Sequence, residues 1–460
     1  MLSMSLSHAQ SQTAITTQSI FEQLLNNVKS LNLKAHSERF GALEVELHQL
    51  FAAAERECMK KLLENYDWDY PVFQSNELTF QKASRNKKRY MTLAGEIELE
   101  RTLYRTKRNG PTISPLELNT GIIEGFWTPQ SAKQAIHLVS LLTPVECENV
   151  FAEFGLMSPS KSSIDRLPKH LNKYWEEQRT GLERQLFNQY EIPVDASLFA
   201  ISLDGVMIST RYTQILPGDS RWAEACCGTV SFYNSEGELL NTHYLARMPE
   251  QHKRTLKDQL SFYFDVIREK RPDLKVIKIA DGARDNWTFL DGELPSGECV
   301  LDFYHASQHL NEAMQIIYGK NSLSSIVNYK KYRGILLEHE KGIDKVINHL
   351  KYKKRQGIDH KKLQTEITYF TRHKLRCHYA QLIEQNKPIG SGVVESACKT
   401  VVQMRLKRSG QHWNNDGGQA ILNFRAILLS QCLDDAWKLV EGFYYQPITP
   451  PKNVVKMVVN

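Results

Sequence analysis

The chain has 460 residues, of which 41% are hydrophobic, and this ordinary composition predicts a soluble protein of roughly two to four domains with a sizeable core. The formal net charge of +6 favours an anionic partner only slightly. The distribution of charge along the sequence is a stronger indication of such a partner than the total, because lysines and arginines are concentrated at 82–108, 329–376 and 399–408.

Several classes of protein are disfavoured from the outset. The eight cysteines form no Cys-x-x-Cys pair, which argues against a zinc ribbon or finger and fits a reducing cytoplasm. The opening residues, MLSMSLSHAQSQTAI, lack the apolar core of a signal peptide. No apolar run reaches about 18 residues, so no membrane span is expected. The sequence therefore predicts a cytoplasmic protein without a membrane partner.

The N-terminal region, 1–80, is expected to be helical, since apolar residues recur at helical spacing within 15–65. Residues 81–129 predict a basic β-hairpin followed by a linker rich in glycine and proline. The hairpin strands would be Tyr90–Leu93 and Ile97–Tyr104, with Ala94-Gly95 at the turn. The cations around this hairpin fit a DNA contact and a solvated charged rim equally well.

Residues 130–195 predict a helical region that resembles a helix-turn-helix. Gly155 would end its second helix, and Ser158 would cap the third, which opens with SPSKSSIDR. If the third helix reads DNA, Lys161 and Arg166 would face a groove. Many helical bundles show the same pattern, so a purely structural bundle is an equal alternative.

Residues 196–310 change to alternating strands and helices. The apolar strand LFAISLDGVMIST contains Asp204, and two further strands follow, joined by a Ser-Glu-Gly turn. After an amphipathic helix, the strand LKVIKIADGA ends in Asp281, and CVLDFYHASQHL runs from a fifth strand into a helix. This is the ribonuclease H-like order, with three antiparallel strands and later parallel ones. The predicted fold class is α/β, with a ribonuclease H-like catalytic domain.

A large all-helical insertion is expected at 311–388, which contains the basic stretches KYKKRQ and HKK. Residues 389–440 predict a helix that carries Glu395, followed by C-terminal helices, and 441–460 predict an irregular tail. Glu395 lies in the first turn of its helix. An ordinary surface helix with an i,i+4 ion pair is the simplest alternative. Cations follow the glutamate, namely Lys399, Arg405, Lys407 and Arg408.

Three carboxylates stand out from this order: Asp204, Asp281 and Glu395. In a ribonuclease H-like sheet the first and fourth strands are adjacent, so the two aspartates would project at the same end. A helix behind the sheet could supply the glutamate. Two Mg²⁺ ions roughly 3.5–4 Å apart need such oxygen ligands, one ion activating the attacking oxygen and the other stabilising the leaving oxygen. Each Asp-Gly pair alone would most often be a turn, so the prediction depends on the combination.

Four blocks of the chain resemble the ISKra-type bacterial insertion-sequence transposases, a group similar to the Mutator-like transposases. The blocks are LDGVMI, IADGARDNW, VLDFYHASQHL and GSGVVESACKTVVQMRLKRSG, and the resemblance covers about residues 80–430. It implies a DDE triad on a ribonuclease H-like fold, with the acids at Asp204, Asp281 and Glu395. It also implies two Mg²⁺ ions as cofactors, with Mn²⁺ as a substitute.

Mutator-like proteins also carry a Cys or Asp followed three positions later by His, which falls here on Asp302 and His305. These residues would contact metal or DNA, or orient the acids. A zinc site built on Asp302, His305 and His309 is an alternative that lacks a fourth ligand. A structural role for His305, hydrogen-bonded beneath the site, is another. The family's small cysteine module has no counterpart in LYRTKRNGPTISPLEL.

The sequence therefore predicts a DDE transposase that cuts DNA at the terminal inverted repeats of its insertion sequence and transfers the strand to target DNA. Its partner would be double-stranded DNA, and it would form a homo-oligomer, at least a dimer on DNA, associated with the nucleoid. Arg284 and Trp413 join the DNA-binding candidates, although a core position is the stronger alternative for Trp413. A ribonuclease H-like nuclease without strand transfer and a catalytically silent DNA-binding regulator derived from a transposase stay open as alternatives.

Overall fold

The computed structural model describes residues 22, 25–30, 39–75, 78–155, 157–211, 221–358 and 361–448. The chain divides into two compact units, the first formed by Met1–Leu171 with Ala436–Asn460 and the second by Asn172–Asp435. Among residues 1–38 only 22 and 25–30 are described, so most of the helical region predicted there lies outside the described residues. Of the predicted irregular tail, 441–460, residues 449–460 lie outside as well, but helix α18, Leu433–Tyr444, extends into this range, so the tail prediction was wrong for 441–444. No helix of the described part is both long and apolar enough to span a membrane.

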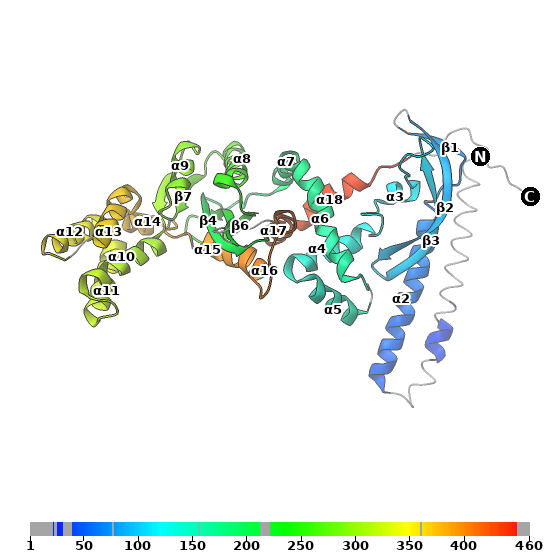
Figure 1. Cartoon of the computed structure of the whole chain (residues 1–460), viewed down its shortest axis with the longest axis horizontal. Coiled ribbons are helices and arrows are strands. Elements are labelled where there is room, and N and C mark those ends of the chain that lie inside the picture. Colours follow the sequence, from blue (N-terminus) through cyan, green and yellow to red (C-terminus); the bar gives the residue numbers. More distant parts are fainter. Residues whose placement is uncertain are drawn as a thin grey trace, which may run out of the picture. The chain divides into compact units, whose positions relative to one another are not determined.

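The first unit contains a three-stranded antiparallel sheet in the order β1-β2-β3, formed by Val72–Ser75, Leu78–Thr92 and Gly95–Arg105 (Figure 1). The predicted hairpin is confirmed, but its first strand begins at Leu78 and its turn is Leu93-Ala94, between the paired Thr92 and Gly95. Alternate side chains of the hairpin are buried with helix α2, Phe40–Glu64, which sets the register of the two strands.

Helices account for the rest of the first unit. The expected linker contains α3, Pro115–Thr120, and is followed by α4, Pro129–Leu141, and α5, Pro144–Phe154. Gly155 ends α5 with a φ of 73°, as predicted. Helix α6, Lys161–Glu177, is capped by Ser160, whose Oγ accepts from the Ser163 amide at 3.2 Å, so the prediction of Ser158 as the cap was wrong.

The second unit is built on a five-stranded sheet in the order β6-β5-β4-β7-β8. The strands are β4 Leu198–Ser209, β5 Trp222–Tyr233, β6 Leu239–Arg247, β7 Lys275–Ala280 and β8 Glu298–Leu301. Strands β4, β5 and β6 pair antiparallel, whereas β4 with β7 and β7 with β8 pair in parallel. The predicted adjacency of the first and fourth strands is confirmed.

Both faces of this sheet are covered by helices (Figure 1). Phe199, Ile201 and Leu203 of β4 pack with α7, Arg179–Gln189, α8, Arg254–Lys270, and α9, Arg284–Gly292. Residues one position away, such as Ala200, pack on the other face with α10, Phe303–Tyr318. The alternation follows from the two-residue period of a strand.

The predicted helical segment after β8 is confirmed and is continuous with this second core. Leu336, Leu350 and Phe370 share one cluster with Ala200 of the sheet. The helices are α11 Leu323–Glu338, α12 Gly342–Arg355, α13 Lys361–Arg372, the short η2 Lys374–Arg376 and α14 Tyr379–Glu384. These helices therefore add to one face of the sheet instead of forming a core of their own.

The glutamate helix is irregular. It begins as α15, Gly392–Ala397, continues as a π-helical stretch at Cys398–Gln403, and ends in α16, Met404–Leu406. The chain then reaches α17, Asn415–Leu429, and α18, Leu433–Tyr444. A π-helical insert rotates the residues on either side of it relative to each other, which changes the faces that a regular helix would present.

Candidate functional site

Asp204 and Asp281 lie at the same level of neighbouring parallel strands. The pairing of β4 with β7 runs in register from Leu198 with Lys275 to Ser202 with Ile279. If this register is continued by two residues, Asp204 of β4 is opposite Asp281, the first residue after β7, and both follow residues that face the same side of the sheet. This is the face covered by α10, because Ala200 and Ile279 pack there.

The environment of Asp204 disfavours its charged form. Burial raises the pKa of the Asp204 carboxyl, and the nearby charge of Asp281 raises it further. The Gly205 amide donates to Asp204 Oδ1 at 2.7 Å and opposes this shift, as do the charges of His305 and Lys253. A carboxylate whose ionisation is disfavoured by burial and by a second, nearby carboxylate is a favourable ligand for a cation.

Asp281 is fixed by the first turn of α9. Its Oδ1 accepts from the Ala283 amide at 3.1 Å and from Asn286 Nδ2 at 2.9 Å, while its main-chain oxygen accepts from Trp287 Nε1 at 2.5 Å. Within the described part of the chain, the hydrogen bonds to this carboxylate all fall on Oδ1. The side chain is therefore oriented, and Oδ2 is left for another ligand.

Asp302 joins the start of α10 to the turn before α15. It is 1% exposed, accepts from the Tyr304 amide at 2.8 Å, and accepts a short hydrogen bond from the Ser391 hydroxyl. His305 Nε2 lies 3.8 Å from Asp302 Oδ2. These contacts place Asp302 as a buried support, and the influence of His305 on Asp204 places the imidazole near the two aspartates.

Glu395 is exposed, and its amide donates to the Ser391 carbonyl at 2.9 Å. Cys398, one turn further on, lies with its Sγ 3.7 Å from Asp204 Oδ2 and is hydrogen-bonded to the Cys227 thiol. The segment that carries Glu395 is thus held against β4. Among the described residues, however, Asp204, Asp281 and Glu395 do not form a set with ligand atoms all within 4.8 Å of one another.

The zinc alternative built on Asp302, His305 and His309 is not supported. His309 Nδ1 instead lies 2.8 Å from Glu366 Oε2, while Asp302 is engaged by Ser391. In the described part of the chain, the one group of His, Cys and acidic residues with ligand-like spacing consists of His309, Glu312 and Glu366.

The predicted DNA-binding residues after Glu395 differ in exposure. Lys399 and Lys407 are exposed, and Arg408 is half-buried with its Nε donating to the Met404 carbonyl at 3.2 Å. Arg405 is 1% exposed and lies over the Trp413 ring, 5.2 Å from its centroid. The expectation that Arg405 contacts DNA is therefore wrong for this structure, because its guanidinium is packed inside the protein.

Trp413 is half-buried and is anchored by its polar groups. Its Nε1 donates to the Leu406 carbonyl at 3.0 Å, and its amide donates to the Ser209 carbonyl at 3.1 Å. These bonds attach the loop after α16 to the end of β4. The packing role foreseen for this tryptophan is what the structure shows, and a free wedge for DNA is not.

The remaining DNA-binding candidates lie at helix starts. Arg284 is exposed in the first turn of α9, three residues after Asp281. In the first unit Lys161 and Arg166 are exposed on α6, but Arg166 Nε is 2.8 Å from Glu124 Oε1. Arg284 is thus the candidate cation that the chain places nearest in sequence to a predicted catalytic acid.

Sequence reasoning missed Lys253 and Cys398 as neighbours of Asp204. Lys253 has a φ of 53° and Nζ 3.4 Å from Glu224 Oε1. It lies in QHKRTL, a segment that carries no motif. Cys398 could have been suspected, since it follows Glu395 by three positions and therefore shares its helical face.

The comparisons with known proteins do not assign this chain to a family. No family model and no curated protein matches the sequence. Among solved structures, the chain is similar to the "Drosophila P element transposase strand transfer complex", with 11% identity over 69% of this chain and 81% of that chain, at a TM-score of 0.26. A TM-score this low does not establish a common fold. The fold and the site together define a mixed α/β protein with two aspartates in register at the end of parallel strands.

Proposed function

We propose that this chain is a DDE transposase with a ribonuclease H-like core, which cleaves DNA at the ends of its insertion sequence and transfers the strand to target DNA. The observation that carries the proposal is the register of β4 and β7, which aligns Asp204 with Asp281 on one face. The sheet order β6-β5-β4-β7-β8 supports it, since it is the order foreseen for a ribonuclease H-like domain.

The two aspartates fit a hard divalent cation. Neither carboxylate has a Lys or Arg ion-pair partner among the residues that the structure describes, and Asp204 is desolvated beside Asp281. Hard oxygen ligands of this kind suit Mg²⁺ or Mn²⁺. Asp204, Asp281 and Glu395 would hold the ions, which when bound activate the attacking oxygen and stabilise the leaving oxygen.

The protein's own residues would prepare this site in stages. Asn286 and the Ala283 amide orient Asp281, and the Gly205 amide orients Asp204. The bond from Ser391 to Asp302 positions the start of α15, which carries Glu395. Since Glu395 is exposed and outside the carboxylate set, α15 or the glutamate side chain would have to move to complete the site.

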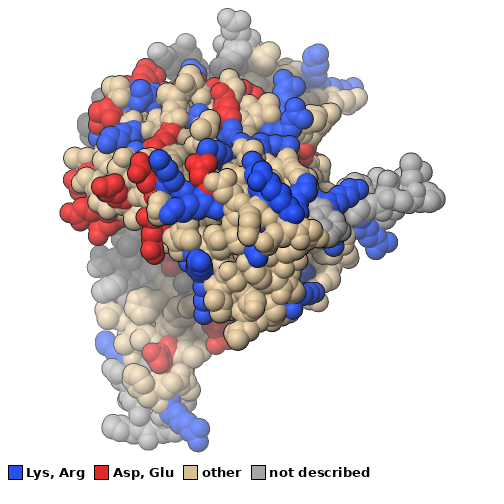
Figure 2. Space-filling model, turned by 90° about the vertical axis from the view of Figure 1, so that its left-hand side faces the viewer, with Lys and Arg blue, Asp and Glu red and all other residues tan. Residues whose placement is uncertain are grey.

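The helices after β8 offer a cationic surface for the DNA backbone. Figure 2, which views the chain from the side where α11 and α12 lie in Figure 1, shows Lys and Arg side chains spread over this face, with Asp and Glu side chains gathered on one part of it. Charge of this kind binds phosphates without regard to sequence. The exposed cations of α11, α12 and α13 include Lys330, Lys331, Lys351, Lys354, Arg355 and Lys361.

The proposal is tested with the purified protein, Mg²⁺, and a labelled DNA fragment that contains its coding sequence and the flanking DNA. We expect metal-dependent cuts at defined ends and joining of the cut strand to a second, unlabelled plasmid. Cuts without joining would identify the nuclease alternative. Binding with no cut in Mg²⁺ or Mn²⁺ would contradict the proposal and favour the regulator.

A further inference from the structure

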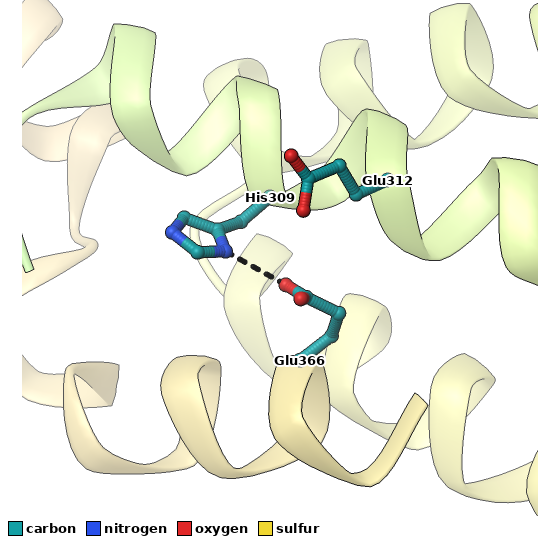
Figure 3. Close-up of side chains that lie close together, drawn as sticks. All are labelled: His309, Glu312 and Glu366. Atoms are coloured by element: carbon teal, nitrogen blue, oxygen red, sulfur yellow. Dashed lines mark hydrogen bonds and ion pairs between the residues drawn. The ribbon is translucent and has the colours of Figure 1, made fainter. Parts of the chain in front are cut away.

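Three side chains with metal-binding atoms gather between two helices outside the predicted catalytic site. His309 and Glu312 are three residues apart on α10, and Glu366 faces them from α13 (Figure 3). Their ligand atoms all lie within 4.8 Å of one another. Residues at i and i+3 share one face of a helix, so the local structure alone directs His309 and Glu312 to the same place.

Glu366 is unusual for a carboxylate because it is 5% exposed. Its partner is the His309 imidazole, with Nδ1 2.8 Å from Oε2, and among the described residues no Lys or Arg pairs with it. A buried carboxylate is costly unless it is paired with a positive charge or binds a metal. The second carboxylate, Glu312, adds to this cost because its oxygens also point into the space between the helices (Figure 3).

We propose that His309, Glu312 and Glu366 bind a divalent transition-metal ion of the Zn²⁺ class. One imidazole and two carboxylates form a mixed nitrogen and oxygen set that suits Zn²⁺ better than Mg²⁺. Ligands about 2.0–2.2 Å from a tetrahedral ion lie about 3.3 Å apart. The contact between His309 and Glu366 needs to open by only a few tenths of an ångström to reach this spacing, and water would complete the shell.

The surroundings of His309 support a fixed ligand. The Tyr369 ring stacks on the imidazole with centroids 3.7 Å apart and planes at 23°. The same tyrosine lies against Gly282, where an added Cβ would collide with its ring. An ion at this site would therefore hold α13 to α10 and, through Tyr369, restrain the backbone beside Asp281.

The test uses the full chain carrying Asp204→Asn and Asp281→Asn, so that the predicted catalytic acids do not compete for the ion. Zn²⁺ is titrated under reducing conditions, and bound metal and melting temperature are measured. We expect one equivalent of Zn²⁺ and a higher melting temperature. Adding Glu312→Gln should weaken binding at least about tenfold. The control is Glu340→Gln, an exposed acid in the turn between α11 and α12, which should change nothing.

Glu312→Gln distinguishes a metal site from a hydrogen bond that only joins the two helices. Glu312 is exposed, so its replacement leaves the hydrogen bond between His309 and Glu366 intact. If Zn²⁺ affinity is the same with and without Glu312→Gln, the cluster is only a hydrogen bond between helices and the proposal is overturned. Co²⁺ provides a second readout, since a thiolate charge-transfer band would show that cysteines bind the ion instead. Both outcomes are independent of whether the chain is a transposase.

Discussion

At the scale of residues, side chains of the same type differ because of what surrounds them. Asp204 is desolvated and faces Asp281, whereas Asp302 is more deeply buried but is satisfied by Ser391 and the Tyr304 amide. A second carboxylate opposes the charge of Asp204, whereas two hydrogen bonds stabilise and orient Asp302. This contrast assigns Asp204 to the reacting site and Asp302 to its support.

Glu183 provides a prediction about pH. Burial raises the pKa of this carboxyl from its ordinary value of 4.5 to about 7, and Gln259 Nε2 donates to its Oε1 at 2.5 Å. Because the folded state binds the proton more tightly than the unfolded state, the free energy of unfolding should fall as pH rises from about 4.5 through about 7. The loss amounts to about 3 kcal/mol.

Glu183→Gln should remove most of this pH dependence and stabilise the protein at pH values above about 7, as measured by denaturant unfolding. The new amide would also be able to donate to Gln259 Oε1, a buried atom that has no hydrogen-bond partner among the described residues. Equal pH dependence in the wild type and in Glu183→Gln would show that another group is responsible.

Arg405 and Lys407 make a matched pair, since both belong to the cationic stretch after Glu395 but only Arg405 is buried. Arg405→Ala should lower the free energy of unfolding by about 3 kcal/mol, because it removes packing over Trp413. Lys407→Ala should change it by less than about 0.5 kcal/mol.

In DNA binding Lys407→Ala should have the larger effect and Arg405→Ala the smaller. Lys407→Ala should lower the slope of log affinity against log salt by about one. For Arg405, this comparison requires conditions in which the variant is folded. A neutral effect of Arg405→Ala on unfolding would contradict its burial.

At the scale of elements, the sequence predicted the strands and most helices because their apolar periods match their surroundings. Strand order predicted that Asp204 and Asp281 lie at the same end of adjacent strands, but their alignment in register is visible only in the structure. The π-helical stretch at Cys398–Gln403 and the buried Arg405 could not be foreseen. A basic run has the same composition whether its arginine faces water or a tryptophan.

The hairpin of the first unit is a second case in which the sequence shows cations but not what surrounds them. Its cations resembled a DNA-binding surface in the sequence, yet acids of β3 lie opposite them. Arg89 is 3.2 Å from Glu96, and Lys87 is 3.7 Å from Glu98. Such exposed pairs contribute little to stability, but they reduce the charge available to a phosphate.

The cationic helices should therefore contribute more to DNA binding than the hairpin. Replacing Lys351, Lys354 and Arg355 of α12 together by Gln should lower the salt slope by about two to three. Replacing Lys87 and Arg89 of the hairpin in the same way should lower it by less than about one, because their acidic partners already offset them. Binding curves at several salt concentrations provide the measurement, and the opposite ranking would place the DNA on the hairpin.

At the scale of the whole molecule, the two units divide the predicted roles. The second unit contains the five-stranded sheet, all three predicted catalytic acids and the cationic helices, and the first contains the hairpin, α4, α5 and the first part of α6. The sequence could place the acids on their elements, but it could not show that Glu395 stays outside the carboxylate set. That position depends on how α15 packs on β4 and β5, which no local pattern encodes.

The most direct test of the central claim compares strand cleavage in Mg²⁺ by the wild type with Asp204→Asn, Asp281→Asn and Glu395→Gln, with DNA binding measured for each. The amides keep the size of the side chains but remove the charge that holds the cation, so each variant should lose cleavage and keep nearly full DNA binding. Asp285→Asn, which alters an exposed acid paired with Lys257, is the control and should retain cleavage. Wild-type cleavage by Asp204→Asn or Asp281→Asn would contradict the assignment of the aligned aspartates as the catalytic pair.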